Sequence, residues 1–108
     1  MSTRTTQASP ATFAMSVQEK LTLNFDMASL LNSADNEEVT DVVTKLTNGT
    51  SRAVIPLTDH PTHNTSTIDQ TIDGAELKAG LTFRLGILFT AAPSANRWLV
   101  ELSIVAIP

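Results

Sequence analysis

The sequence contains no cysteine, few charged residues and no long apolar run. Without cysteine, disulfide bridges and cysteine-ligated zinc sites are excluded, so the fold must rest on its apolar core. No stretch approaches the roughly 20 apolar residues that a membrane-spanning helix needs. Residues 1–15 also lack the apolar run of a signal peptide. We therefore expect no membrane partner and a protein that acts in the compartment where it is made, or that leaves by lysis.

Positive charge is scarce and dispersed. The chain of 108 residues has a net charge of −4, and its seven Lys and Arg residues stand singly along the sequence. A nucleic-acid-binding surface needs concentrated basic residues to displace counterions from phosphates. The sequence therefore predicts no nucleic-acid partner.

The residue patterns of enzymes and cofactor sites are missing as well. His60 and His63 lie in one loop beside Asp59, and no further ligand stands at zinc-site spacing. The acidic run 35–38 does not match a calcium-binding loop. The chain has no Gly-x-Ser-x-Gly elbow, and its four glycines are dispersed rather than gathered in a phosphate-binding loop. We expect no catalytic, metal-binding or cofactor-binding residue and no small-molecule substrate.

The clearest positive signal is the alternation of apolar and other residues between Leu81 and Ile107. A period of two places successive side chains on opposite faces of a strand, and the intervening AAPSAN segment is typical of a hairpin connection. We therefore predict a long antiparallel hairpin. Its predicted inner face comprises Phe83, Leu85, Ile87, Phe89, Trp98, Val100, Leu102 and Ile104.

The rest of the chain carries shorter strand patterns. Strands are predicted over 17–25, 52–58 and 65–72, with a single helical turn after Asp26, whose side chain can accept a backbone hydrogen bond. Residues 37–46 are ambiguous, because their apolar residues fall at helical spacing whereas the many Val and Thr residues favour a strand. We interpret this segment as a strand because its surroundings are β-rich.

Turn signals recur about every ten residues between these strands. That rhythm is typical of a β-sandwich. We predict an all-β fold, an Ig-like antiparallel β-sandwich of about seven strands over residues 17–108. An extended N-terminal arm over residues 1–16 precedes it.

The arm is rich in Ser, Thr, Ala and Pro and shows no apolar period. Such a segment cannot bury enough surface by itself to offset the entropy lost on ordering. It is either a frayed terminus or a segment that docks on a neighbouring subunit. In the second case the predicted partner contacts are Pro10, Phe13 and Met15.

The outer face of the hairpin provides a second set of predicted partner contacts, namely Leu88, Leu99, Val105 and Ile107. A solvated sheet face does not need so many apolar residues, so we expect them to cover a subunit contact. Trp98 is assigned to the core rather than to a recognition surface because it lies on the inner face.

Several short motifs resemble those of small virion proteins of tailed bacteriophages. The opening matches at Lys20-Leu21 and Phe25-Asp26, and the following turn matches at residues 29–31. A strand motif matches at 38–40. The remaining matches are Thr67-Ile68, Ile72-Asp73-Gly74, Leu77, Gly80, Phe83, Leu85, Phe89-Thr90 and residues 98–105. The chain is similar in this respect to head-decoration, neck and fibre-adaptor proteins with Ig-like folds.

The resemblance implies a non-enzymatic virion subunit, assembled in the host cytoplasm, that binds other virion proteins and copies of itself. It leaves open whether the chain decorates the head or joins neck, tail and fibre. The alternative is a carbohydrate- or host-surface-binding module that uses loops 59–64 and 91–96, although these loops hold no aromatic residue. A small hydrolase would require one of the histidines to meet a Ser or Thr nucleophile.

Overall fold

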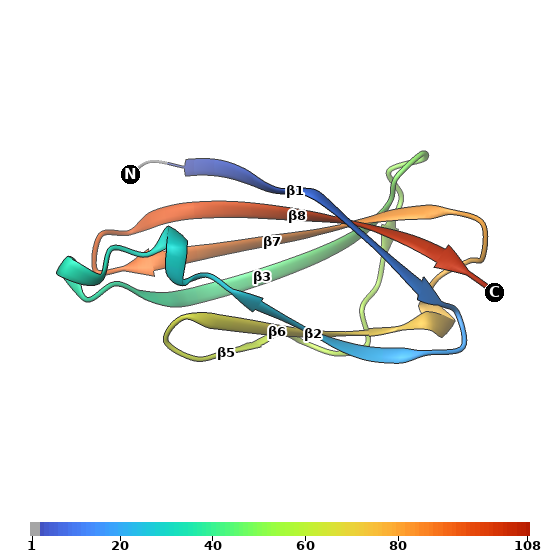
Figure 1. Ribbon diagram of the computed structural model, residues 1–108, viewed down its shortest axis with the longest axis horizontal. Helices are drawn as coiled ribbons and strands as arrows, with labels where there is room; N and C mark the ends of the chain where they lie inside the picture. The colour runs from blue at the N-terminus through green and yellow to red at the C-terminus, as the bar shows by residue number, and fades with distance from the viewer. Residues whose placement is uncertain (1–2) are drawn as a thin grey trace.

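The computed structural model describes residues 3–108, apart from the side chains of residues 3–11 and of Ser33. This part of the chain forms two stacked β-sheets and no α-helix, so the predicted all-β sandwich is confirmed. The molecule is elongated, measuring 45 × 22 × 22 Å, and its long strands run along the longest axis (Figure 1).

The larger sheet has five strands in the order β1-β8-β7-β3-β4. Its strands are β1 (Thr3–Ser16), β3 (Glu38–Asn48), β4 (Val54–Ile55), β7 (Thr82–Ala92) and β8 (Asn96–Ile107). β7 and β8 form the predicted hairpin, with Phe83 opposite Ile104 and Ala91 opposite Asn96. β3 pairs antiparallel with β7, which confirms that residues 37–46 contain a strand rather than a helix.

The smaller sheet has three strands in the order β2-β6-β5. Its strands are β2 (Lys20–Asp26), β5 (Thr62–His63) and β6 (Thr67–Asp73). In Figure 1 this sheet lies below the larger one and faces it. Its inner side buries Ile68 and Ile72 of β6 and half-buries the apolar residues of β2, so strand alternation holds in both.

Within residues 3–108, three single 3₁₀ turns connect the strands. They are η1 (Ala28–Leu30), η2 (Ser33–Asp35) and η3 (Gly74–Glu76). Asp26 accepts a hydrogen bond from the Ala28 amide at 2.9 Å, which confirms the predicted turn after β2. Gly74 packs against the turn between β1 and β2, and a Cβ atom there would lie only 2.5 Å from the Ser16 carbonyl oxygen. Only glycine fits such a close backbone approach.

The core lies between the two sheets, and the predicted inner face of the hairpin contributes a large part of it. Of that set, Phe83, Leu85, Ile87, Phe89, Val100 and Ile104 are buried, and Trp98 and Leu102 pack against them half-buried. One polar side chain, Gln70, is fully buried among them. It accepts a hydrogen bond from Thr44 of β3 at 2.6 Å and donates to the Asp59 carbonyl at 2.9 Å, so it joins the two layers.

The N-terminal segment differs from the expected free arm. Residues 3–16 form β1, which pairs in parallel with β8 of the same chain and so departs from a purely antiparallel sandwich. β1 passes from the far end of the larger sheet to the turn that leads into β2 (Figure 1). The physical reason is that an uncovered β8 would present a row of unpaired backbone groups, which β1 satisfies.

Candidate partner-binding surface

The outer faces of the two sheets differ in chemistry. On the smaller sheet the outward side chains are polar and bind one another, with Thr22 and Thr71 at 2.7 Å and Asn24 donating to Asp69 at 2.5 Å. The larger sheet carries exposed apolar side chains on its outer side instead. A solvated sheet face needs no such residues, so the larger sheet is the candidate binding surface.

A β-bulge in β3 builds the apolar part of this surface. The register between β3 and β7 shifts between Thr40 and Val43, and Asp41 has a φ of 50°. The extra residue reverses the alternation, so Val39 is buried whereas Val43 is 59% exposed. Val43 lies opposite Leu88, and Leu88 lies opposite Leu99, so the three side chains form one row across β3, β7 and β8.

A second row on the same face, two residues further along each strand, carries charged side chains. Lys45 of β3 lies opposite Gly86 of β7, which lies opposite Glu101 of β8. Glu101 also contacts Arg84, with 3.5 Å between its Oε2 and the arginine Nε. Because these side chains are partly solvated, the ion pair itself contributes little to stability. It does keep the carboxylate on the outer face, beside the apolar row.

The two rows enclose a shallow hollow centred on Gly86, which has no side chain to fill it. The hollow has a volume of about 290 Å³ and is lined by Val43, Lys45, Thr47, Arg84, Gly86, Leu88, Leu99 and Glu101. A Cβ atom at position 86 would make only ordinary contact, 3.7 Å from the Leu99 Cδ1 atom. The glycine therefore leaves space at the surface rather than relieving a clash within the chain. We name these eight residues the outer patch.

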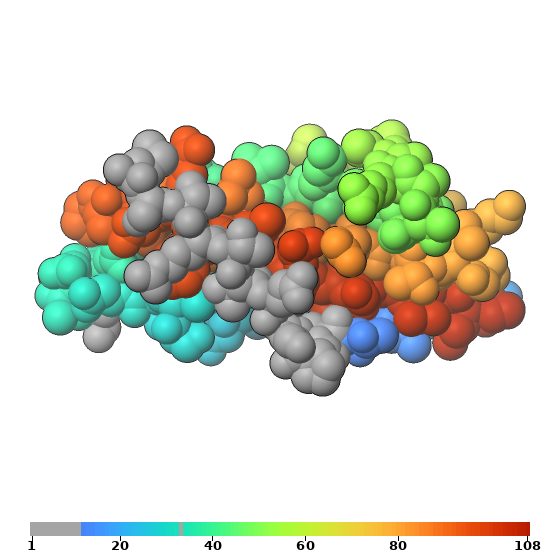
Figure 2. Space-filling model, turned by 90° about the horizontal axis from the view of Figure 1, so that it is seen from above, coloured from blue at the N-terminus to red at the C-terminus, as the bar shows by residue number. Residues whose placement is uncertain are grey.

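The structure brings together only half of the outer-face residues predicted from sequence. Leu88 and Leu99 belong to the outer patch, and Val43 joins them although sequence reasoning missed it. Val105 and Ile107 lie on the same side of β8, but six and eight residues beyond Leu99. At about 3.3 Å per residue that is roughly 20 Å or more away. Figure 2 views this side of the molecule, with the green segment around residue 50 beside the orange of β7.

The predicted arm contacts are placed differently from the expectation. Met15 is fully buried in the chain's own core, and Phe13 packs against that core half-buried. Phe13 lies beside Ile104 and Met15 beside Ala106 in the parallel pairing. The prediction that Met15 contacts a partner is therefore corrected, because strand alternation directs it inward. The side chain of Pro10 lies outside the described part.

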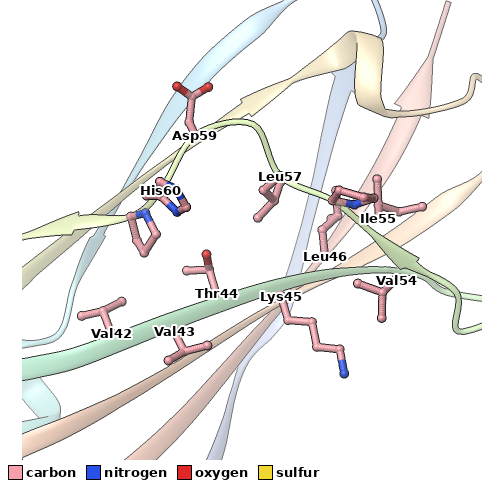
Figure 3. A pocket seen from close by; sticks show the side chains of 12 residues that line it. Val42, Val43, Thr44, Lys45, Leu46, Val54, Ile55, Leu57, Asp59 and His60 are labelled. Atoms are coloured by element: carbon pink, nitrogen blue, oxygen red, sulfur yellow. The ribbon is translucent and has the colours of Figure 1, made fainter.

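A groove runs along the other edge of the larger sheet, where β3 is only partly covered. β4 pairs with β3 at Leu46 and Thr47 alone, after which Pro56 takes the chain away. The groove, about 300 Å³, lies between residues 42–46 of β3 and segment 54–61. Figure 3 shows Thr44 and Leu57 directed into the space between these segments, whereas the Asp59 carboxylate points away from it.

Glu37 organises the end of the sandwich nearest to the hairpin turn. Its carboxylate accepts hydrogen bonds from the Ser94 hydroxyl and, at 2.7 Å, from the Asn32 amide. These bonds lower the pKa of Glu37, and desolvation opposes them only in part. The side chain thus fixes the loop before β3 to the turn between β7 and β8.

Within residues 3–108, no three His, Asp or Glu side chains gather in a way that could hold a metal ion. No helix in the same range is long and apolar enough to cross a membrane. The comparisons with protein-family models, with curated proteins and with solved structures find no match to this chain.

Proposed function

We propose that this protein is a non-enzymatic structural subunit of a tailed-bacteriophage particle, a neck or tail adaptor or a capsid decoration protein. The motif resemblance supplies the virion context. The single structural observation that supports a binding role is the outer patch, an apolar row exposed at Val43 and half-buried at Leu88 and Leu99, beside a charged row on the same sheet face. Core apolar contacts with a polar rim are the usual composition of protein interfaces.

The groove along β3 offers such a subunit a second way to bind. An edge with unpaired backbone groups accepts a strand from another protein, which gains main-chain hydrogen bonds and buries alternate side chains. A strand added beside residues 42–45 would continue the row that β4 begins, and the apolar groove walls would receive its side chains. Other virion proteins would bind here.

The carbohydrate-binding alternative has less support. Sugar-binding surfaces commonly place aromatic rings beside polar groups at exposed loops, and loops 59–64 and 91–96 contain no aromatic residue. The apolar surface lies on the sheet instead. A protein partner with a complementary face fits such a surface better than a sugar does.

Particle composition tests the proposal. Intact particles purified from the source of the chain should contain it in a fixed ratio to the capsid protein by quantitative mass spectrometry. A Leu88→Asp variant, supplied in place of the native chain, should be depleted from particles because it places an unpaired charge in the apolar row. A Thr71→Asp variant, on the outer face of the smaller sheet, should be retained. Absence of the native chain from intact particles would overturn the proposal.

A further inference from the structure

We infer that the outer patch pairs with the same patch of a second copy of this chain, across a twofold axis that runs along β7. This inference rests on the proposed role of the larger sheet as a binding surface and names what covers it. Two independent observations support it: an apolar row on the outer face, and the placement of Lys45 and Glu101 on either side of β7, which pairs opposite charges under this symmetry.

The apolar row is centred on β7. β3 and β8 are the two neighbours of β7, so Val43 and Leu99 lie on either side of Leu88. A twofold axis along β7 turns each side onto the other, because a twofold contact always pairs a patch with itself. Val43 then faces Leu99 of the second copy, and Leu88 faces Leu88. All three side chains leave water, which drives association.

The charged row fixes the direction of the axis. Lys45 and Glu101 flank Gly86, so the same rotation brings Lys45 opposite Glu101 of the second copy, twice per dimer. An axis across the strands would instead bring Lys45 opposite Lys45 and Glu101 opposite Glu101. Like charges facing each other across an interface are unfavourable. The axis along β7 gives two pairs of opposite charge; Arg84, also on β7, then faces Arg84 of the second copy, but each arginine keeps the Glu101 carboxylate of its own chain at 3.5 Å.

The centre of the patch suits close packing of two sheets. Stacked sheets lie about 10 Å apart with their strands within about 30° of parallel. Gly86 presents no side chain at the centre and faces Gly86 of the second copy, so the two hollows join there and the flanking Lys45 and Glu101 side chains can reach across the contact. β3, β7 and β8 are long strands, but three strands are only about 14 Å across. The area buried in the contact is therefore near the lower limit for a specific interface, and we expect a dimer whose formation depends on protein concentration.

Charge reversal of the second row gives a sharp test. Lys45→Glu places a second carboxylate opposite Glu101 of the other copy, and Glu101→Lys places a second ammonium group opposite Lys45. Each variant alone should therefore lose self-association by roughly tenfold or more. An equimolar mixture of the two should dimerise, because every facing pair is then of opposite charge. The double variant Lys45→Glu/Glu101→Lys should dimerise by itself for the same reason.

Sedimentation velocity of the purified proteins across a wide concentration range would measure these equilibria. Lys78→Glu makes the same charge change at an exposed site away from the outer patch and should leave the native dimer intact. Both single variants remain net negative, so rescue in the mixture cannot come from general attraction. A monomeric native chain at all concentrations, or a mixture no more associated than its components, would overturn the inference. Because particle incorporation is measured separately, failure here does not decide the proposed function.

Discussion

Among single residues, Glu37 shows how a buried carboxylate couples two loops. The hydrogen bonds that it accepts from the Ser94 hydroxyl and from the backbone amide of Asn32 both favour the ionised carboxylate. The pKa of Glu37 is therefore lower in the folded chain than in the unfolded one. A group of this kind stabilises the fold at pH values above its unfolded pKa. That contribution is lost as the pH falls through the unfolded value towards the folded one.

We therefore predict that Glu37→Gln destabilises the protein most at neutral pH. The difference in urea midpoint between native and variant proteins should shrink as the pH is lowered from neutral to below about 4, because the native carboxylate then becomes protonated. The comparison isolates Glu37 from the other titrating groups, which both proteins share. A difference that is the same at neutral and acidic pH would contradict the assigned role.

The sequence predicts the strand that contains Gln70 but not the role of the Gln70 side chain. The strand predicted over 65–72 corresponds to β6, which buries Ile68 and Ile72 on its inner face, and Gln70 shares that face by the period of two. A polar residue at that position carries no local signal of its partners. Those partners, Thr44 and the Asp59 carbonyl, come from segments that only the tertiary fold brings together.

At the scale of elements, patterns of period two predicted the hairpin, β2 and β6 because these strands keep one uninterrupted alternation. The bulge in β3 shows where that reasoning stops. Val39 and Val43 have the same parity and would share a face in a regular strand, yet one is buried and the other is exposed. The sequence around Asp41 carries no glycine or proline to mark the extra residue, so the three outer-patch residues of β3, Val43, Lys45 and Thr47, could not be predicted.

β1 is the second element that sequence reasoning placed differently. Its residues show no apolar period because the strand lies at the edge of the sheet; among its described side chains, Met15 lies in the core. The burial of Met15 distinguishes a free arm from a strand of the fold. An arm that awaits a neighbour would leave it free in the isolated chain, whereas a strand of the fold buries it.

Met15→Ala should therefore destabilise the isolated protein by about 2–5 kcal/mol, the usual cost of truncating a fully buried Met or Leu. Chemical denaturation of the purified protein, at a concentration where it is monomeric, measures this. Val54→Ala, at a position 58% exposed, should change stability by less than about 0.5 kcal/mol. A Met15 variant as stable as the Val54 variant would restore the free-arm interpretation.

At the scale of the whole molecule, the two sheets differ in the chemistry of their outer faces. The smaller sheet closes the core and presents polar side chains that hydrogen-bond to one another on its outer face. The larger sheet carries the apolar row, the charged row and the open edge of β3. If both proposals hold, the chain pairs with its own copy through the outer patch and with a different protein through the edge of β3.

The absence of cysteine allows the central claim, that the outer face of the larger sheet is the contact surface, to be tested at one position. Leu88→Cys introduces a single thiol that lies on the inferred twofold axis, facing its own copy. A bismaleimide cross-linker with a reach of about 10 Å, the spacing of stacked sheets, should convert this variant into a covalent dimer, whereas Thr71→Cys on the smaller sheet should stay monomeric. Equal cross-linking of the two variants, or none with Leu88→Cys, would contradict the account.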